Sequence, residues 1–371
     1  MIVVGQDLHV RNSMLFATDE DGKLLDRRRC PNRPEDMVAF WERVLTAAGG
    51  ELQPVRVVLE ATTNTRAGRQ LMIDSAAKLG LPISAEVVNP RKIRLIAESV
   101  CKTDLLDAQV LNELGRANLR LPVCYMPDDE EFALREHLRA RSDLVRLRTM
   151  VKNRVHALLH RRGILTPQDG LFSKAGRAFL EQVEWDEAGR EILQRFLALM
   201  GQINEAIDAS TASLRAVQRR ERWRHNAALL QTMPGMGLIT ALTILAELGD
   251  LARFRSRAAV SNYAGLTPRV RSSDDRRRLG HISRRGSAHL RHMLVEAAWV
   301  AIRRVPAYAA LFERVAARRG KCVAIVAVAR RMLENAWVML KRSEPFRYVP
   351  PVRGPEGTTR VDEWVVPSVA G

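Results

Sequence analysis

Residues 54–61 read Pro-Val-Arg-Val-Val-Leu-Glu-Ala, a short apolar run that begins with proline and ends next to one acidic residue, Glu60. Its length and its β-branched residues predict a buried β-strand. Three similar runs precede it, at residues 2–9, 13–18 and 24–30. Turn chemistry at Asp19-Glu20-Asp21-Gly22 separates the last two runs. The simplest arrangement of these three strands is therefore an antiparallel meander.

Helical patterns alternate with strand patterns over residues 1–125. Apolar residues recur at helical spacing after Pro34, and residues 66–79 predict a second helix beyond the Glu60 strand. Residues 83–89 predict one more strand, and helical signals then run to about residue 118. The order βββαβαβα predicts an α/β domain with a mixed sheet. It is the order of the ribonuclease-H-like fold, although periodicity leaves other α/β folds open.

Four carboxylates fall at points that this topology would bring together. Asp7 lies near the end of the first strand, and Glu60 lies at the end of the strand predicted for residues 54–61. If that strand joins the far side of the first one, the two ends are neighbours. Thr103 can cap a helix whose first turn holds Asp104 and Asp107, and their i, i+3 spacing places both on one face.

Carboxylates held close together repel one another, so a stable cluster of this kind requires cations. Hard oxygen ligands suit Mg²⁺ or Mn²⁺. Two such ions about 4 Å apart can activate a nucleophile and stabilise a leaving oxygen at phosphorus. The set therefore predicts a metal-assisted phosphoryl-transfer site, whereas each acidic residue taken alone is also compatible with an ordinary solvated charge.

The remaining chain is mainly helical by pattern. Apolar stripes over residues 126–225 predict two long helices that form an antiparallel hairpin or a coiled-coil arm, for dimerisation or as a packed spacer. A third, mainly helical unit is expected over residues 226–343. The tail, residues 344–371, is rich in Pro, Val and Gly and is expected to be irregular.

Charge points to a polyanionic partner. The chain of 371 residues holds 59 Lys and Arg against 42 Asp and Glu, a formal net charge of +17. Such an excess favours nucleic acid above all, with a membrane surface as the rival partner. No apolar run approaches the roughly 20 residues of a spanning helix, and the N-terminus lacks the pattern of a signal peptide. We therefore expect a cytoplasmic protein without a membrane partner, associated with the nucleoid when it acts.

Two segments of the third unit favour phosphate contacts. Pro234-Gly235-Met236-Gly237 before a helical run matches a helix-hairpin-helix motif, in which free backbone N–H groups can meet a phosphate. An ordinary tight turn between helices explains it equally well. The second segment, residues 263–286, is basic, punctuated by glycine, and predicted to be a loop between helices. A serine there could act as a nucleophile, although phosphate binding is the more favoured role.

The residues expected to contact nucleic acid are Gly235, Gly237, Arg269, Arg271, Arg276, Arg277, Arg278, Arg284 and Arg285.

These motifs together carry a resemblance. They are Gly5-Gln6-Asp7, Leu59-Glu60-Ala61-Thr62, Lys102-Thr103-Asp104-Leu105-Leu106-Asp107-Ala108, Pro234-Gly235-Met236-Gly237, and Gly265-Leu266-Thr267-Pro268 followed by Ser273 and Gly280-His281-Ile282-Ser283-Arg284-Arg285-Gly286. In this order and over nearly the whole chain, the set resembles the DEDD transposases, the recombinases of insertion-sequence family one-ten.

The resemblance implies a RuvC-like N-terminal domain, a coiled-coil linker and a C-terminal transposase domain. It implies that a serine of the C-terminal domain attacks DNA and forms a covalent phosphoserine intermediate, assisted by metal-bound Asp7, Glu60, Asp104 and Asp107 in a homodimer or homotetramer. Relatives of this kind are guided by a structured bridge RNA that pairs with donor and target DNA, so the protein would read shape and backbone.

On the family pattern the nucleophile falls at Ser273, with Ser272 as the adjacent alternative. The family usually has Gly directly after this serine, whereas Asp274 and Asp275 follow here. The alternative function is that of a RuvC-like metal-dependent DNA nuclease or resolvase. In such an enzyme metal-activated water cleaves DNA, and the serine segment only binds phosphate. His9 and Asn64 receive no role.

Overall fold

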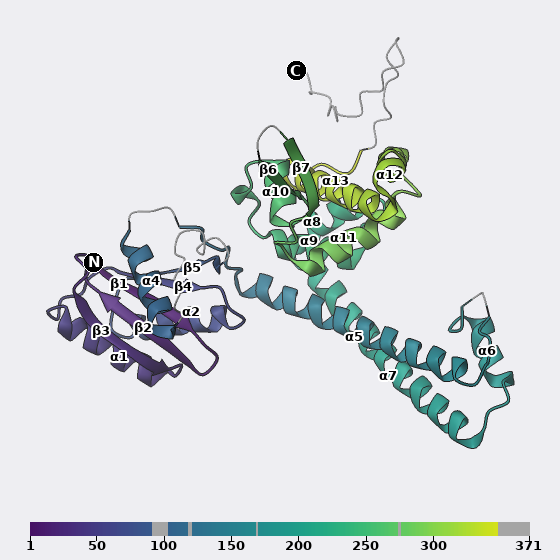
Figure 1. Ribbon diagram of the computed structural model, residues 1–371, viewed down its shortest axis with the longest axis horizontal. Coiled ribbons are helices and arrows are strands. Elements are labelled where there is room, and N and C mark those ends of the chain that lie inside the picture. Colours follow the sequence, from purple (N-terminus) through teal and green to yellow (C-terminus); the bar gives the residue numbers. More distant parts are fainter. Residues whose placement is uncertain (91–102, 118–120, 168–169, 274–275, 348–371) are drawn as a thin grey trace, which may run out of the picture. The chain divides into compact units, whose positions relative to one another are not determined.

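A computed structural model describes residues 1–90, 103–117, 121–167, 170–273 and 276–347, with side chains undescribed over residues 270–279. The chain divides into two compact units, Met1–Met126 and Pro127–Gly371. The first unit is a mixed α/β domain and the second is mainly helical (Figure 1). Among the described residues, no helix has the length and hydropathy that crossing a membrane would need.

One five-stranded sheet forms the centre of the first unit. Its strands are β1 (Ile2–Leu8), β2 (Asn12–Thr18), β3 (Leu24–Pro31), β4 (Val55–Glu60) and β5 (Ile83–Val88). They lie in the order β3-β2-β1-β4-β5. Antiparallel pairing joins β1 to β2 and β2 to β3, which confirms the predicted meander. The β4 strand pairs in parallel with β1 on its other side, as expected.

Helices cover both faces of this sheet. On one face, α1 (Pro34–Ala47) and α2 (Thr65–Ala77) pack over a core that contains the fully buried Trp41. On the other face, α4 (Asp104–Arg116) lies across β1, β2 and β4. Buried Asn112 of α4 donates hydrogen bonds to the carbonyls of Val3 (2.7 Å) and Phe16 (3.1 Å). These hydrogen bonds fix the position of α4 on β1 and β2.

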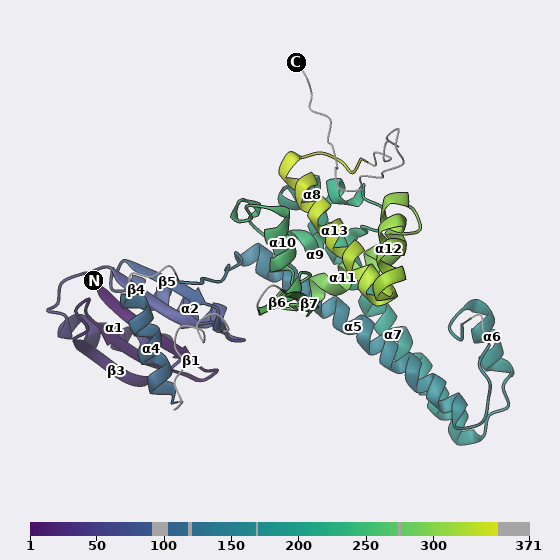
Figure 2. The same ribbon diagram turned by 45° about the horizontal axis from the view of Figure 1, so that its top comes forward.

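Two helices of 32 residues each, α5 (Asp129–His160) and α7 (Glu187–Gln218), form an arm in the second unit. Arg141 bonds to Thr211 (2.8 Å) and Arg148 to Asn204 (3.4 Å), so the helices run antiparallel, as predicted. Figure 2 shows them side by side along their length. A short helix, α6 (Lys174–Gln182), stands in the connection between them and was not predicted.

A helical bundle completes the second unit. Its helices are α8 (Glu221–Gln231), α9 (Leu238–Leu248), the 3-10 turn η1 (Leu251–Arg253), α10 (Arg257–Tyr263), α11 (Ala288–Ala301), α12 (Pro306–Arg319) and α13 (Lys321–Arg342). The most central is α9, which is buried from Thr240 to Leu248. Position 226, the expected start of a third domain, lies inside α8. Of the tail, residues 344–347 form neither helix nor strand, and the rest lies outside the described residues.

The basic serine segment is not the loop expected from its sequence. It contains two paired strands, β6 (Pro268–Ser273) and β7 (Arg276–Ile282). Its many arginines and small residues hid the strand pattern, because apolar alternation is the main sequence signal for a strand. A connection of two residues between paired runs is typical of a β-hairpin, and Asp274-Asp275 has that length.

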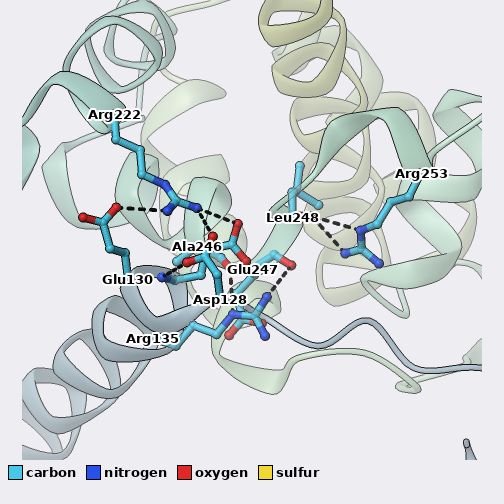
Figure 3. A network of polar contacts seen from close by, with 9 residues as sticks. Asp128, Glu130, Arg135, Arg222, Ala246, Glu247, Leu248 and Arg253 are labelled. Atoms are coloured by element: carbon cyan, nitrogen blue, oxygen red, sulfur yellow. Dashed lines mark hydrogen bonds and ion pairs between the residues drawn. The ribbon is translucent and has the colours of Figure 1, made fainter. Parts of the chain in front are cut away.

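Arginine side chains join the base of the arm to the bundle (Figure 3). Arg135 of α5 donates to the carbonyls of Ala246 (2.7 Å) and Glu247 (3.3 Å), and Arg253 donates to that of Leu248 (2.9 Å). A helix leaves its last carbonyls without partners of its own, and these guanidinium groups supply them for α9. Arg222 of α8 pairs with Glu130 (2.9 Å) at the start of α5.

Buried Glu247 is the carboxylate at this junction. It accepts hydrogen bonds from Arg139 of α5 (2.9 Å) and from Ser287 (3.0 Å), which caps α11. We expect Glu247→Ala to lower the free energy of unfolding by about 2–3 kcal/mol, because it removes the partner of the half-exposed Arg139 guanidinium and of the partly buried Ser287 hydroxyl. Urea unfolding measures the loss.

The matched control is Glu191→Ala, which removes an exposed carboxylate paired with Arg195 on α7. It should cost about 0.5 kcal/mol or less. Equal losses in the two variants would contradict the role given to Glu247.

Candidate functional site

The pairing of β1 with β4 sets the positions of two of the predicted carboxylates. Gly5 of β1 pairs with Val58 of β4 in parallel register. Because residues alternate between the faces of a sheet, Asp7 and Glu60, each two positions farther along, fall on the same face and at the same edge. It is the face that α4 covers, since Val58 belongs to the core beneath α4.

The N-terminus of α4 brings the other two aspartates to this face. The Thr103 hydroxyl accepts a hydrogen bond from the backbone N–H of Leu106 (3.3 Å), which confirms the predicted cap. Asp104 and Asp107 then lie in the first turn, where the helix dipole favours negative charge. The close approach of α4 to β1 depends on Gly5, because a Cβ there would lie 1.9 Å from the carbonyl oxygen of Ala108.

His9 joins this cluster, although the sequence analysis assigned it no role. Its Nε2 atom lies 3.2 Å from Oδ2 of Asp7 and 3.4 Å from Oδ2 of Asp104. Asn32 (2.8 Å) and Asn64 (2.9 Å) both donate to the carbonyl of His9 and hold the turn after β1. The available signal was the place of His9 directly after the strand that carries Asp7.

Arg29 is a further member of the cluster that the sequence analysis did not predict. Its Nη2 atom lies 2.5 Å from Oδ2 of Asp104. Arg29 comes from β3, which is separated from β1 by β2, and only the folded sheet brings it close. The Arg29 guanidinium and the His9 imidazole therefore both contact Asp104.

The electrostatics of Asp7 reflect a site that demands positive charge. Burial raises the pKa of its carboxyl group, the neighbouring His9 lowers it, and the charges of Asp104 and Asp107 raise it further. A divalent cation would relieve the same repulsion. Within the described residues, the ligand atoms that lie within 4.8 Å of one another come from Asp7, His9 and Asp104.

This donor set fits a divalent metal ion. Carboxylate oxygens suit Mg²⁺ and Mn²⁺, and an imidazole is more usual around transition metals. Glu60 and Asp107 lie outside the close group; Asp107 acts on Asp7 through its charge, and Glu60 stands on the same face.

The second unit holds the predicted serine near the end of its hairpin. Ser273 pairs with Arg276, Ser272 with Arg277, and Arg271 with Arg278. Residues along a strand alternate between its two faces, and directly opposed residues share one. The residues on the same face as Ser273 are accordingly Arg271, Arg276 and Arg278. Ser272 falls on the opposite face with Arg277.

The base of this hairpin carries the other predicted arginines. Arg269, Arg284 and Arg285 are exposed. One guanidinium nitrogen of Arg269 lies 3.4 Å from the carbonyl oxygen of Ser283 and donates to it. Arg269 therefore lies next to the segment that follows the hairpin. This segment contains Arg284 and Arg285.

The two glycines of the predicted helix-hairpin-helix motif have different surroundings. Gly235 has a φ of 90°, and a Cβ there would lie 2.3 Å from the carbonyl oxygen of Ala297 in α11. Packing on α11 therefore explains Gly235. Gly237 is exposed at the N-cap of α9, with no atom within 4 Å of a Cβ built on it. Of the two, Gly237 has the space that a phosphate contact requires.

The first unit carries an acidic cluster and the second a basic hairpin. Comparisons with known proteins define the class of the chain as DNA transposases. Residues 4–162 match a model of DEDD transposases of the IS110 type, and residues 227–313 match the transposase IS116/IS110/IS902 family. The protein belongs to the IS110 family of insertion-sequence transposases and is a DNA recombinase.

Individual relatives agree with this assignment. The chain is 30% identical to a probable family 20 transposase of Pseudomonas aeruginosa, over 69% of its own length and 79% of the relative. It is 26% identical to the transposase for insertion sequence element IS1111A of Coxiella burnetii, over 93% and 91% of the two chains. A pilin gene-inverting protein of Moraxella bovis is 26% identical over 70% of the chain and 73% of the relative.

Proposed function

We propose that this transposase cleaves and rejoins DNA strands through Ser273, assisted by a divalent metal ion, Mg²⁺ or Mn²⁺, at Asp7, Glu60, Asp104 and Asp107. The observation that carries the proposal is the cluster in which Asp7 and Asp104 share close contacts with His9, in a chain that belongs to a transposase family. The first unit then acts as a RuvC-like domain, the arm as a coiled-coil linker, and the bundle with its hairpin as the transposase domain.

The serine step is a displacement at phosphorus. The Ser273 oxygen forms a bond to the phosphorus of the scissile phosphate, and the bond from phosphorus to one deoxyribose oxygen breaks. The hydroxyl proton is transferred to that leaving oxygen, so a free DNA hydroxyl and a phosphoserine result. Attack by a second DNA hydroxyl reverses the step and joins the strands without an external energy source.

Each half of the site has a separate task in this proposal. A bound divalent ion would neutralise charge on the scissile phosphate and polarise its oxygens. The carboxylates hold that ion, and the first turn of α4 orients two of them. The arginines that share a face with Ser273, namely Arg271, Arg276 and Arg278, attract the DNA backbone and favour the alkoxide form of the serine.

Ser273 is preferred over Ser272 because of these neighbours. Ser272 falls on the opposite face, opposite Arg277 alone. Asp274 and Asp275 follow the serine where relatives usually carry Gly, and they add negative charge next to it. The register places three arginines on the face of Ser273 and one on the face of Ser272.

Partners follow from the same proposal. The net charge of +17 fits an enzyme that holds donor DNA, target DNA and a structured guide RNA at once. If base pairing with the RNA selects the sequence, the protein needs only contacts to shape and backbone. The active form is a homodimer or homotetramer, in which the carboxylates of one protomer serve the serine of another.

A metal-dependent nuclease is the second candidate, because Asp7, His9 and Asp104 already form a compact ligand group within one unit. In that case water cleaves the DNA and the hairpin only grips phosphate. The two functions leave different products. A serine recombinase leaves protein covalently attached to a DNA end, whereas the nuclease leaves free ends.

Incubation of the protein with DNA that carries the ends of its element, in Mg²⁺, tests the proposal on a denaturing gel. We expect a covalent protein–DNA band that is digested by protease and that is absent from Ser273→Ala. Ser272→Ala serves as the control and should retain the band. A band in both serine variants would exclude the serine mechanism, and free ends without a band would favour the nuclease.

A further inference from the structure

Arg284 adopts a backbone conformation that is unfavourable for its residue type. Its φ is 53°, in the left-handed region, and the only other non-glycine residue with a positive φ among the described residues is Ser343 (φ 55°). A side chain in this region clashes with its own backbone, so glycine is the usual occupant. Such residues persist where their surroundings impose the conformation, and they cluster at ligand-binding sites.

Backbone contacts at the base of the hairpin impose this conformation. Ser283 donates its backbone N–H to the carbonyl of Thr267 (2.8 Å), and Arg284 donates to that of Gly265 (3.1 Å). Gly286 allows the two segments to touch, since a Cβ there would lie 2.0 Å from the carbonyl oxygen of Tyr263. These contacts require the backbone shape at position 284, but none of them requires an arginine side chain.

Within the described residues, no acidic partner explains the Arg284 side chain. Arg284 and Arg285 are both exposed, and neither forms an ion pair in the part of the chain that the structure describes. Burial lowers the pKa of the nearby Arg291 guanidinium, and the charge of Arg284 lowers it further. Arg291 is occupied with the carbonyls of Ala264 (3.1 Å) and Gly286 (2.7 Å). Uncompensated positive charge therefore accumulates at this turn.

We propose that Arg284 binds a backbone phosphate of DNA at the base of the β6–β7 hairpin, and that its left-handed backbone is retained to aim the guanidinium at that phosphate. A planar guanidinium can contact two phosphate oxygens at once, and glycine at this position would lose that contact. The inference rests on the proposed function in one respect: the phosphate lies near the one that Ser273 attacks.

Arg284→Gly distinguishes DNA binding from a structural role of the side chain. The change should relieve the backbone strain at position 284 and also remove the contact of the guanidinium with phosphate. We expect its Tm to equal or exceed that of the unchanged protein, by on the order of 2 °C. Its affinity for a mixed-sequence 30-base-pair DNA duplex should fall by about 5- to 10-fold near physiological salt. The slope of log Kd against log salt should decrease by about 1, as expected for one lost phosphate contact.

Three further variants complete the experiment. Arg284→Lys should keep the salt slope, because it keeps the charge. Arg318→Ala removes an exposed arginine from the end of α12 and controls for net charge; the slope should not change. Ser343→Gly relieves the other left-handed residue and should bind DNA as the unchanged protein does.

Unchanged affinity and salt slope in Arg284→Gly would overturn the proposal, as would an equal loss of slope in Arg318→Ala. Both measurements concern binding without cleavage. Failure here is therefore distinguishable from failure of the serine mechanism, which the covalent band reports separately.

Discussion

Asp7→Asn is expected to lower the rate of strand cleavage at least about 1,000-fold, because it removes a metal ligand from the centre of the cluster. The same change should make the metal-free protein more stable. Asn has nearly the same shape as Asp, so the close packing of α4 on β1 need not change. Cleavage on a DNA substrate and thermal unfolding in EDTA measure the two effects.

The stability effect follows from the sign of the pKa shift. Folding raises the pKa of the Asp7 carboxyl, chiefly through burial and also through Asp104 and Asp107. A raised pKa means that the folded state disfavours the charged form. Near pH 7 this charge opposes folding, and its cost diminishes as the pH falls through the folded-state pKa. Asparagine removes the cost at every pH, so the gain in Tm should shrink as the solution is acidified.

Asp21→Asn is the matched control for Asp7→Asn. Asp21 is an exposed carboxylate in the turn between β2 and β3 of the same unit. This variant should cleave DNA at the rate of the unchanged protein. If Asp7→Asn kept more than a tenth of the activity, the carboxylate cluster would not be the metal site.

Gly5→Ala should damage both the fold and the site of the first unit. The added Cβ would lie 1.9 Å from the carbonyl oxygen of Ala108 and 2.5 Å from the backbone nitrogen of Asn112. Both atoms belong to the backbone of α4, so the whole helix must move away from β1. Overpacking of this kind costs about 3 kcal/mol. We expect unfolding by urea at a correspondingly lower concentration.

The displacement of α4 also carries Asp104 away from Asp7. Metal affinity depends on ligand positions to within about 0.5 Å, so cleavage should fall at least about 100-fold even where the protein is still folded. Gly201→Ala is a suitable control because a Cβ on this exposed glycine of α7 meets no atom within 4 Å. It should be neutral or stabilising by about 1 kcal/mol. Normal cleavage by folded Gly5→Ala would show that α4 does not set the site.

Much of the first unit could be predicted because its signals are local. Apolar runs bounded by turn residues gave the strands, and the meander followed from their short connections. The prediction that the ends of β1 and β4 are neighbours required one more assumption, namely that β4 joins the side of β1 away from β2. The parallel pairing of β1 with β4 confirms this assumption. Thr103 was identified as a cap because capping depends only on residues a few positions away.

The missed features depend on contacts between distant parts of the chain or on uncommon backbone angles. His9 and Arg29 reach Asp104 only after three strands have paired, so no spacing in the sequence reveals them. The hairpin around Ser273 lacks the apolar alternation that marks most strands. The left-handed backbone of Arg284 has no sequence signal at all, because non-glycine residues there are uncommon.

We propose that Ser273 becomes covalently linked to DNA in a reaction that depends on the carboxylate cluster. Mass spectrometry of the peptide that remains on the DNA after cleavage and protease digestion tests it most directly. We predict a phosphodiester on Ser273, formed by the unchanged protein and not by Asp7→Asn. A DNA link on any other residue, or cleaved DNA without a linked peptide, would contradict it.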